Sequence, residues 1–146
     1  MNRLASLVML LPISLSAGSY KGSNIEKALD ISANRSGVPH RLLKSICMVE
    51  SKLNPKAFNK YDGGSPSYGL CQVKLKTAKW VGYRGNARGL FNPYTNAGLA
   101  GKYLRYQLDR YNGDWIKAIS AYNRGSARLT KNRKYVNLVL NNTLRF

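Results

Sequence analysis

Apolar residues recur along most of this chain at intervals of three and four, the spacing of one face of an α-helix. The clearest case precedes Glu50, where Leu43, Ile46 and Cys47 stand seven, four and three residues before it. Similar spacing occurs in residues 25–32, 97–108, 118–122 and 135–140. No stretch alternates apolar and polar residues for long, so the pattern predicts a mainly α protein of the α+β class, with about six to seven helices.

Residues that favour helix ends mark the boundaries of these segments. Gly37 is expected to end the first helix, and Pro39 suits the first turn of the second. Asn92, which precedes a proline, and Asp114 are typical of the residue that caps a helix start. Gly125 is typical of the residue that follows a helix end.

One stretch of the chain does not follow the helical pattern. Residues 54–68 are polar and contain glycines, with Asp62-Gly63-Gly64 as the core of a turn. We therefore expect at most a small hairpin near residues 60–73, followed by a short helix over residues 77–81. We find no repeats, linkers or low-complexity tracts, and the length suits one compact domain.

The first sixteen residues have the features of a secretory signal peptide. Arg3 provides a basic start, residues 4–15 are apolar, and small residues suited to cleavage follow. We therefore expect residues 1–16 to be a signal peptide and residues 17–146 to form the mature domain. The alternative is a retained N-terminal anchor.

The chain has two cysteines, Cys47 and Cys71. Export would place them in an oxidising compartment, where a pair of cysteines tends to form a disulfide bond. The alternative is two buried free thiols.

The charge of the chain is strongly unbalanced. It has 24 Lys and Arg against 6 Asp and Glu, a formal net charge of +18, and 44% hydrophobic residues. A folded domain with this charge is expected to bind a polyanion, and nucleic acid, an anionic cell wall or a membrane surface would each fit. The basic residues are spread along the chain, and we find neither zinc-finger spacing nor an RNP-type aromatic motif. The charge alone leaves the partner open.

Most kinds of catalytic site are excluded by counting residues. The single histidine, His40, cannot build a metal site with two thiols and scattered acids, and no serine has the nucleophile-elbow pattern. No P-loop or dinucleotide fingerprint is present, so we expect no cofactor and no metal. Acid–base catalysis by a carboxyl group remains. Four acids fall on exposed helical faces or at caps, namely Glu26, Asp30, Asp109 and Asp114. Glu50 and Asp62 are left as the acids that a cleft could contain.

Glu50 shares the apolar stripe of its helix. An ionised carboxylate in that environment is costly, so its pKa is expected to rise toward neutrality. A carboxylic acid that is still protonated near neutral pH can act as a general acid. The alternative is a glutamate at a helix end that turns to solvent or pairs with a cation.

Four motifs support the interpretation of Glu50 as a general acid. They are Val49-Glu50-Ser51, then Ser67-Tyr68-Gly69-Leu70-Cys71-Gln72-Val73 with Thr77-Ala78, then Asn92-Pro93 through Asn96, and then Ala121-Tyr122-Asn123-Arg124-Gly125. In this order and spacing the chain resembles the catalytic domain of soluble lytic transglycosylases, in a minimal single-domain form. The resemblance runs from about Ile25 to Leu140 and implies a lysozyme-like fold of the goose type.

The resemblance also implies roles for single residues. Glu50 would be the catalytic residue, and Ser51 of the family's Glu-Ser pair would bind the sugar next to it. Gln72 would line the sugar cleft, and Tyr122 and Asn123 would face the glutamate across it. Two more residues would lie beside the reacting sugar, namely Ser67 and Tyr68.

The expected reaction follows from the same resemblance. The enzyme would cleave the β-1,4 bond between N-acetylmuramic acid and N-acetylglucosamine of peptidoglycan and form a 1,6-anhydromuramoyl product. Glu50 would serve first as acid and then as base. The expected partners are peptidoglycan glycan strands and the anionic cell envelope, with no nucleic acid, and we expect a monomer. The expected location is the periplasm or cell envelope, or delivery to the wall by a bacteriophage.

Two alternatives remain at this point. A goose-type hydrolase would need a second acid, for which Asp62 is the candidate, although Asp-Gly-Gly is also a common turn. Lys74 stands where such lysozymes carry an aspartate, which argues against hydrolysis. The other alternative is a non-catalytic basic protein that binds the wall or DNA.

Overall fold

The computed structural model describes residues 17–146, with side chains described from residue 22 onward, so the expected signal peptide lies outside the described residues. This part of the chain forms six α-helices, a short 3-10 helix and one three-stranded sheet. In chain order the elements are α1 (Ala17–Ser36), α2 (His40–Ser51), β1 (Phe58–Asp62), β2 (Ser65–Tyr68), β3 (Val73–Lys74), α3 (Leu75–Trp80), η1 (Ala87–Phe91), α4 (Pro93–Arg110), α5 (Trp115–Arg124) and α6 (Leu129–Thr143). The predicted fold class, mainly helical with one small sheet, is confirmed.

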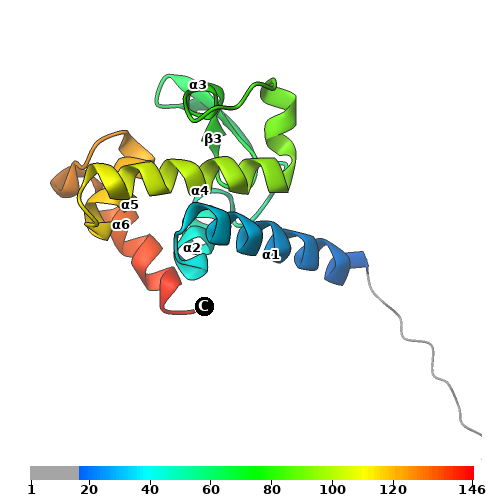
Figure 1. The fold of residues 1–146 in the computed structure, drawn as a ribbon, viewed down its shortest axis with the longest axis horizontal. Coiled ribbons are helices and arrows are strands. Elements are labelled where there is room, and N and C mark those ends of the chain that lie inside the picture. Colours follow the sequence, from blue (N-terminus) through cyan, green and yellow to red (C-terminus); the bar gives the residue numbers. More distant parts are fainter. Residues whose placement is uncertain (1–16) are drawn as a thin grey trace, which may run out of the picture.

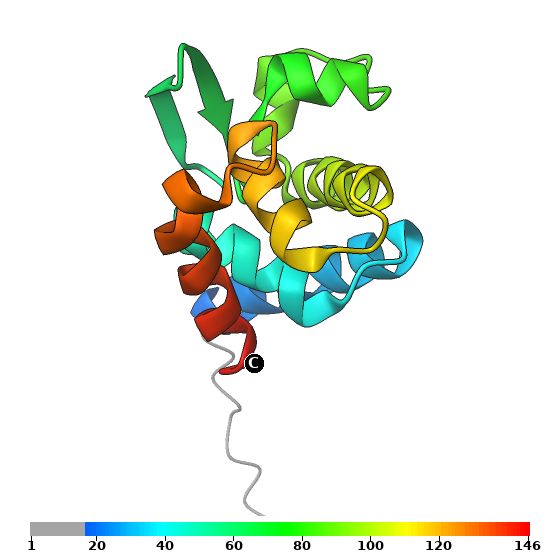
Figure 2. The same cartoon turned by 90° about the vertical axis from the view of Figure 1, so that its left-hand side faces the viewer.

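Helix α4 runs through the middle of the molecule. It packs against α1 and α5, and α6 packs against α2 and α5. The sheet, α3 and η1 lie on one side of α4, and α1 and α2 lie on the other (Figures 1 and 2). Across the described part of the chain, no helix is both long enough and apolar enough to cross a membrane.

The helix ends follow the capping residues read from the sequence. The Asn92 side chain accepts a hydrogen bond from the Thr95 N–H at the start of α4, and Asp114 caps α5 in the same way. Gly125 ends α5 with φ +75°, a left-handed conformation that glycine adopts without strain. Pro39 lies one position earlier than expected, because it is the N-cap of α2 rather than a residue of its first turn.

The sheet extends further than the predicted hairpin. Its strands pair in the order β1-β2-β3, all antiparallel, so a third strand and residues from Phe58 onward join the predicted turn. The turn itself uses Gly63 and Gly64, both with positive φ. The 3-10 helix η1 was not predicted, because five residues carry too little of a periodic pattern to be recognised.

The core is formed by apolar side chains from every long helix. Residues with no exposed surface include Leu29, Leu43, Ile46, Leu104, Ile119 and Val139. Cys47 and Cys71 are also fully buried and form a disulfide bond, as predicted from the sequence. The bond spans 24 residues, which corresponds to about 3 kcal/mol of stabilisation in the chain-entropy model. It connects the helix of Glu50 to the residue before Gln72, and so joins two walls of the cavity described next.

Candidate active site

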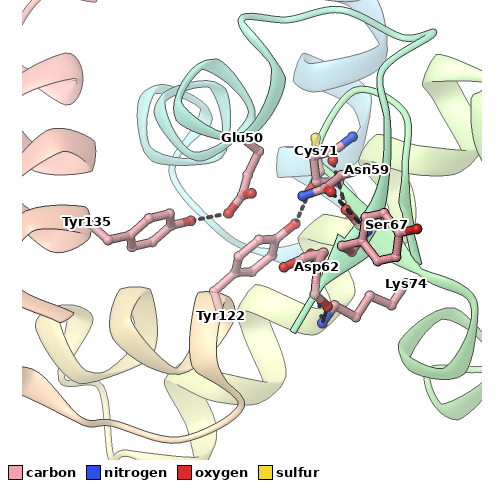
Figure 3. A network of polar contacts seen from close by, with 10 residues as sticks. Glu50, Asn59, Asp62, Ser67, Cys71, Lys74, Tyr122 and Tyr135 are labelled. Carbon is pink, nitrogen blue, oxygen red and sulfur yellow. Dashed lines mark hydrogen bonds and ion pairs between the residues drawn. The ribbon is translucent and has the colours of Figure 1, made fainter. Parts of the chain in front are cut away.

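Glu50 lies in the last turn of α2 and faces a cavity of about 570 Å³. The cavity is lined by residues of the β1–β2 hairpin, β3, α3, α4 and α5. Besides Glu50 they are Asp62, Gly63, Gln72, Val73, Lys74, Thr77, Tyr103, Tyr122, Asn123, Arg124 and Gly125. Figure 3 shows the Glu50 carboxyl directed toward the phenol of Tyr135, with Tyr122 beside it.

The position of Glu50 follows from the sequence of α2. Leu43, Ile46 and Cys47 are fully buried on the stripe that Glu50 shares, so the stripe leads the carboxyl group into the protein. The helix ends two residues later, where Lys52 adopts a left-handed conformation with φ +56°. Glu50 is therefore half-buried at the place where the core opens into the cavity.

The environment of Glu50 raises its pKa. Its pKa lies at about 7 instead of the ordinary 4.5, and burial of the carboxyl group is the largest cause. The charge of Asp62 adds to the rise, while the Tyr135 hydroxyl, the Asn123 amide and the Lys74 ammonium oppose it. The direction agrees with the expectation from the apolar stripe. Near neutral pH both the acid and the base form of the carboxyl group are therefore accessible.

Tyr135 of α6 is a site residue that the sequence analysis missed. Its hydroxyl donates a hydrogen bond to Glu50 Oε1 at 2.6 Å, across 85 residues of sequence. Burial and the nearby Glu50 carboxylate raise the pKa of Tyr135 well above its usual value, so the phenol stays a donor. The sequence analysis placed this residue on the apolar face of the last helix. The hydroxyl group of Tyr135 could have indicated such a role, because a buried tyrosine normally has a hydrogen-bond partner.

Tyr122 and Asn123 both line the cavity from α5. The Tyr122 hydroxyl donates a hydrogen bond to the Cys71 backbone oxygen at 2.9 Å (Figure 3). Burial raises the pKa of this phenol well above its usual value, so it is neutral near pH 7. Asn123 lies close enough to lower the pKa of Glu50 through its amide. These two residues therefore line the same cavity as Glu50.

Gln72 lines the cavity, and its amide is fully engaged by the protein. The Gln72 NH₂ group donates to the Gly69 oxygen at 3.0 Å and to the Ala57 oxygen at 3.3 Å. Its carbonyl oxygen accepts a hydrogen bond from the buried Ser67 hydroxyl at 2.8 Å. Ser67 therefore orients Gln72 from behind the cavity wall.

Two further residues expected beside the sugar also lie outside the cavity lining. The Ser51 hydroxyl donates to the Leu70 oxygen at 2.5 Å and accepts from the Asn54 N–H, which fixes the chain after α2. The Tyr68 ring packs against Phe58 and Phe91, with ring centroids 5.3 and 5.7 Å away. In this structure both residues support the cavity walls rather than face the cavity.

Asn96 of α4 holds the segment that carries Gln72. Its Nδ2 donates to the backbone oxygens of Tyr68 and Leu90, both at 2.7 Å, and its Oδ1 accepts from the Cys71 N–H at 2.8 Å. Its side chain is fully buried. Gly69, with φ +74°, passes so close that an added Cβ would lie 2.5 Å from the Leu90 oxygen. Only glycine fits there, and the close approach lets one amide hold three backbone groups.

Asp62, the candidate second acid, lines the same cavity as Glu50. One of its carboxylate oxygens lies 3.8 Å from the Lys74 ammonium, which also donates to the Asp62 backbone oxygen at 2.6 Å. Figure 3 shows this pair to the right of the Tyr122 side chain. Lys74, which by the resemblance stands where goose-type lysozymes carry an aspartate, therefore pairs with Asp62, the candidate second acid.

Within residues 17–146 no group of three or more His, Cys, Asp or Glu side chains could hold a metal ion. His40 lies at the start of α2, where its ring nitrogen is 3.5 Å from a Glu26 carboxylate oxygen.

Comparison with known proteins identifies the family. Residues 27–143 match the model of the Transglycosylase SLT domain, and the chain belongs to this family. The resemblance read from the four motifs is confirmed.

Two relatives illustrate the range of the family. The chain is 33% identical over 100 residues to the peptidoglycan transglycosylase gp16 of Escherichia phage T7, covering 66% of this chain and 7% of that protein. It is 29% identical over 107 residues to the protein IpgF of Shigella flexneri, covering 72% of this chain and 70% of that protein. The chain thus spans a small part of the phage protein and most of the length of IpgF.

Solved structures share the fold. An inactive mutant of the lytic transglycosylase Slt of Pseudomonas aeruginosa has a TM-score of 0.71 and 22% identity, covering 80% of this chain and 23% of that one. The 70-kDa soluble lytic transglycosylase of Escherichia coli has a TM-score of 0.70 and 21% identity, covering 80% of this chain and 23% of that one. The predicted lysozyme-like fold is confirmed by these likenesses.

Proposed function

We propose that this protein is a peptidoglycan lytic transglycosylase in which Glu50 is the only catalytic carboxyl group. It would cleave the β-1,4 bond between N-acetylmuramic acid and N-acetylglucosamine and release a 1,6-anhydromuramoyl end. The observation that carries the proposal is a carboxyl group with a pKa of about 7 at the wall of a cavity of about 570 Å³, in a chain of the SLT family.

In the first step the protonated Glu50 gives its proton to the glycosidic oxygen. The bond between that oxygen and C1 of the muramoyl unit breaks, and the N-acetylglucosamine leaves with a free hydroxyl group. The acetamido oxygen of the muramoyl unit stabilises the positive charge that develops at C1. Glu50 leaves this step as a carboxylate.

In the second step the C6 hydroxyl oxygen of the same muramoyl unit attacks C1. Its proton passes to the Glu50 carboxylate, which restores the starting acid, and no water is consumed. One group can perform both steps efficiently when its pKa lies near the working pH. The balance of burial against the hydrogen bond from Tyr135 gives Glu50 such a pKa.

The pairing of Asp62 argues against hydrolysis. A hydrolase with two carboxylates needs the second acid as a nucleophile or as a base for water. Asp62 lines the same cavity, which keeps hydrolysis as the second candidate, yet its carboxylate pairs with the Lys74 ammonium. The ion pair with Lys74 thus engages the carboxylate that a hydrolase would use on the sugar or on water.

We expect mass analysis of digested peptidoglycan to show anhydromuramoyl ends. Each such end is lighter by one water molecule than the reducing end that hydrolysis leaves, so the two outcomes are read from one spectrum. Reducing ends as the main product would favour hydrolysis with Asp62. A protein that bound the wall without releasing fragments would favour a non-catalytic basic wall-binding protein.

Replacing Tyr135 with phenylalanine should shift the pH dependence of cleavage. The Tyr135 hydroxyl lowers the pKa of Glu50, so its loss should raise that pKa above about 7. Because the first step needs the protonated acid, the fall of kcat/KM on the alkaline side should move to higher pH. A pH–rate profile on soluble glycan strands measures this shift.

Tyr122 provides the matched control for that experiment. Its hydroxyl donates to the Cys71 oxygen rather than to Glu50, so Tyr122→Phe should leave the alkaline limb in place. An unchanged or acid-shifted limb in Tyr135→Phe would contradict the role given to Tyr135.

The proposal includes a place of action and a partner surface. The net charge of +18 suits the carboxylate- and phosphate-bearing polymers of a cell envelope. Together with the signal-like residues 1–16, this favours an exported protein that acts on the wall, and we propose that it does so as a monomer.

A further inference from the structure

Four aromatic rings form a continuous line from the cavity to the surface. Tyr122 and Tyr103 line the cavity, with ring centroids 5.5 Å apart. The Trp80 ring lies 6.3 Å from Tyr103 and 4.3 Å from Tyr106. The two proposed reaction steps use none of these four rings.

The outer end of the line is open to solvent. Trp80 is 58% exposed and Tyr106 is 39% exposed, and together they form an apolar surface from α3 and α4. Trp80 follows Thr77 by one helical turn and its ring contacts Tyr103, and both of these residues line the cavity. The indole therefore lies next to the cavity lining. Contiguous exposed apolar surface of this kind commonly marks a binding site.

The indole is also held in place without a ligand. It makes edge contacts with both Tyr103 and Tyr106, at interplanar angles of 88° and 78°. The two tyrosine rings are nearly parallel to each other, at 16°, because they lie three residues apart on one face of α4. A ring fixed in this way loses little conformational freedom on binding, which favours affinity.

Helix α3 does not need Trp80 for its attachment. The buried residue of this short helix is Ala78, and Trp80 ends it with more than half of its surface free. A purely structural tryptophan would be expected to bury its large apolar surface instead.

We infer that Trp80 and Tyr106 form a sugar-binding platform that extends the Glu50 cavity. The platform would take the C–H face of a pyranose ring in the same glycan strand, beyond the sugars at the bond to be cut. Aromatic faces supply apolar contact to such rings, while the tyrosine hydroxyl offers a hydrogen bond at the rim. The inference rests on the proposed function, because it takes the cavity to be where the strand is cut.

The platform has a specific consequence for chain length. Strands that fill only the cavity cannot reach Trp80, whereas longer strands gain its contact. Loss of the indole should therefore weaken binding of long strands roughly tenfold, as for other aromatic anchor residues, and leave binding of the shortest strands unchanged.

The test measures binding by calorimetry in the Glu50→Gln variant, which keeps the strands intact. The probes are uncrosslinked strands of alternating N-acetylglucosamine and N-acetylmuramic acid, from the disaccharide upward. Adding Trp80→Ala should remove the gain in affinity with length, and Trp80→Phe should restore most of it. Because Trp80 is largely exposed, neither change should lower the melting temperature by more than a few degrees.

Tyr94→Ala is the matched control. Tyr94 is a similarly exposed aromatic residue, 40% exposed, near the other end of α4, and its loss should not alter the dependence on length. Equal affinities for Trp80→Ala and Tyr94→Ala at every length would overturn the inference, and so would the absence of binding by any strand. Mass analysis of the products of the unsubstituted protein tests the proposed function, whereas strand binding tests the platform. Failure of the platform can therefore be distinguished from failure of the proposed function.

Discussion

Replacing Glu50 with glutamine is expected to lower peptidoglycan cleavage by roughly a thousandfold or more, because one group performs both the acid and the base step. Glutamine keeps the size and shape of the side chain but can neither give nor take the proton. The release of soluble fragments from purified wall measures the loss. Glutamine can still accept the hydrogen bond from Tyr135, so circular dichroism should show an unchanged fold.

The same substitution should raise stability in a pH-dependent way. The folded-state pKa of Glu50, about 7, lies above its ordinary value of 4.5, so the folded protein holds the proton more tightly than the unfolded chain. Stability contributed by this group is therefore present below about pH 4.5 and is lost as the pH rises through about 7. Glutamine does not ionise, so the variant should gain up to about 3 kcal/mol over the native protein at alkaline pH and little at acid pH.

Glu26→Gln is the matched control for both measurements. This variant makes the same chemical change at a half-exposed position of α1, where the Glu26 carboxylate pairs with Lys44. It should keep its activity and show no gain in stability above pH 7. A Glu50→Gln variant that still cleared wall suspensions would refute the catalytic assignment, whatever its stability.

Replacing Asn96 with alanine is expected to lower the free energy of unfolding by about 4 kcal/mol. The change leaves the Cys71 N–H and the oxygens of Tyr68 and Leu90 without the partner that Asn96 provides in the core. Each unsatisfied buried group costs about 1–3 kcal/mol, partly relieved by relaxation of the chain. Denaturant unfolding measures the loss. Activity should fall as well, because the released segment carries Gln72.

Asn92→Ala is the control that shows whether any loss of an asparagine side chain from the start of α4 lowers the free energy of unfolding as much as Asn96→Ala does. Asn92 caps the same helix four residues earlier through one hydrogen bond to the Thr95 N–H, and its loss should cost about 1 kcal/mol. If the two variants lost equal stability, the proposed support of the cavity by Asn96 would be refuted.

The helices could be predicted because their signals are local. Apolar spacing marked the stripe of α2 that contains Leu43 and Ile46, and both residues are fully buried. Asn92 and Asp114 marked helix starts because a cap bond joins residues only three apart. The third strand was missed because Val73 and Lys74 are too few to show an alternating pattern, and they become a strand only by pairing with β2.

The candidate site was predicted in part. Glu50, Gln72, Tyr122 and Asn123 all line one cavity, as the motifs implied. Motif order could not show which way a side chain points. Ser67 is buried behind the wall because neighbouring residues of a strand face opposite sides, and its place within the fold decides which side is the cavity.

The sequence by itself determined the helical class, the family and the one carboxyl group that lies on an apolar stripe. These depend on residues close together in the chain or on motifs with fixed spacing. Only the tertiary structure decided the pKa of Glu50, its partner Tyr135 and the line of rings that ends at Trp80. Burial and contacts between distant residues set these features, and both exist only once the chain has packed against itself.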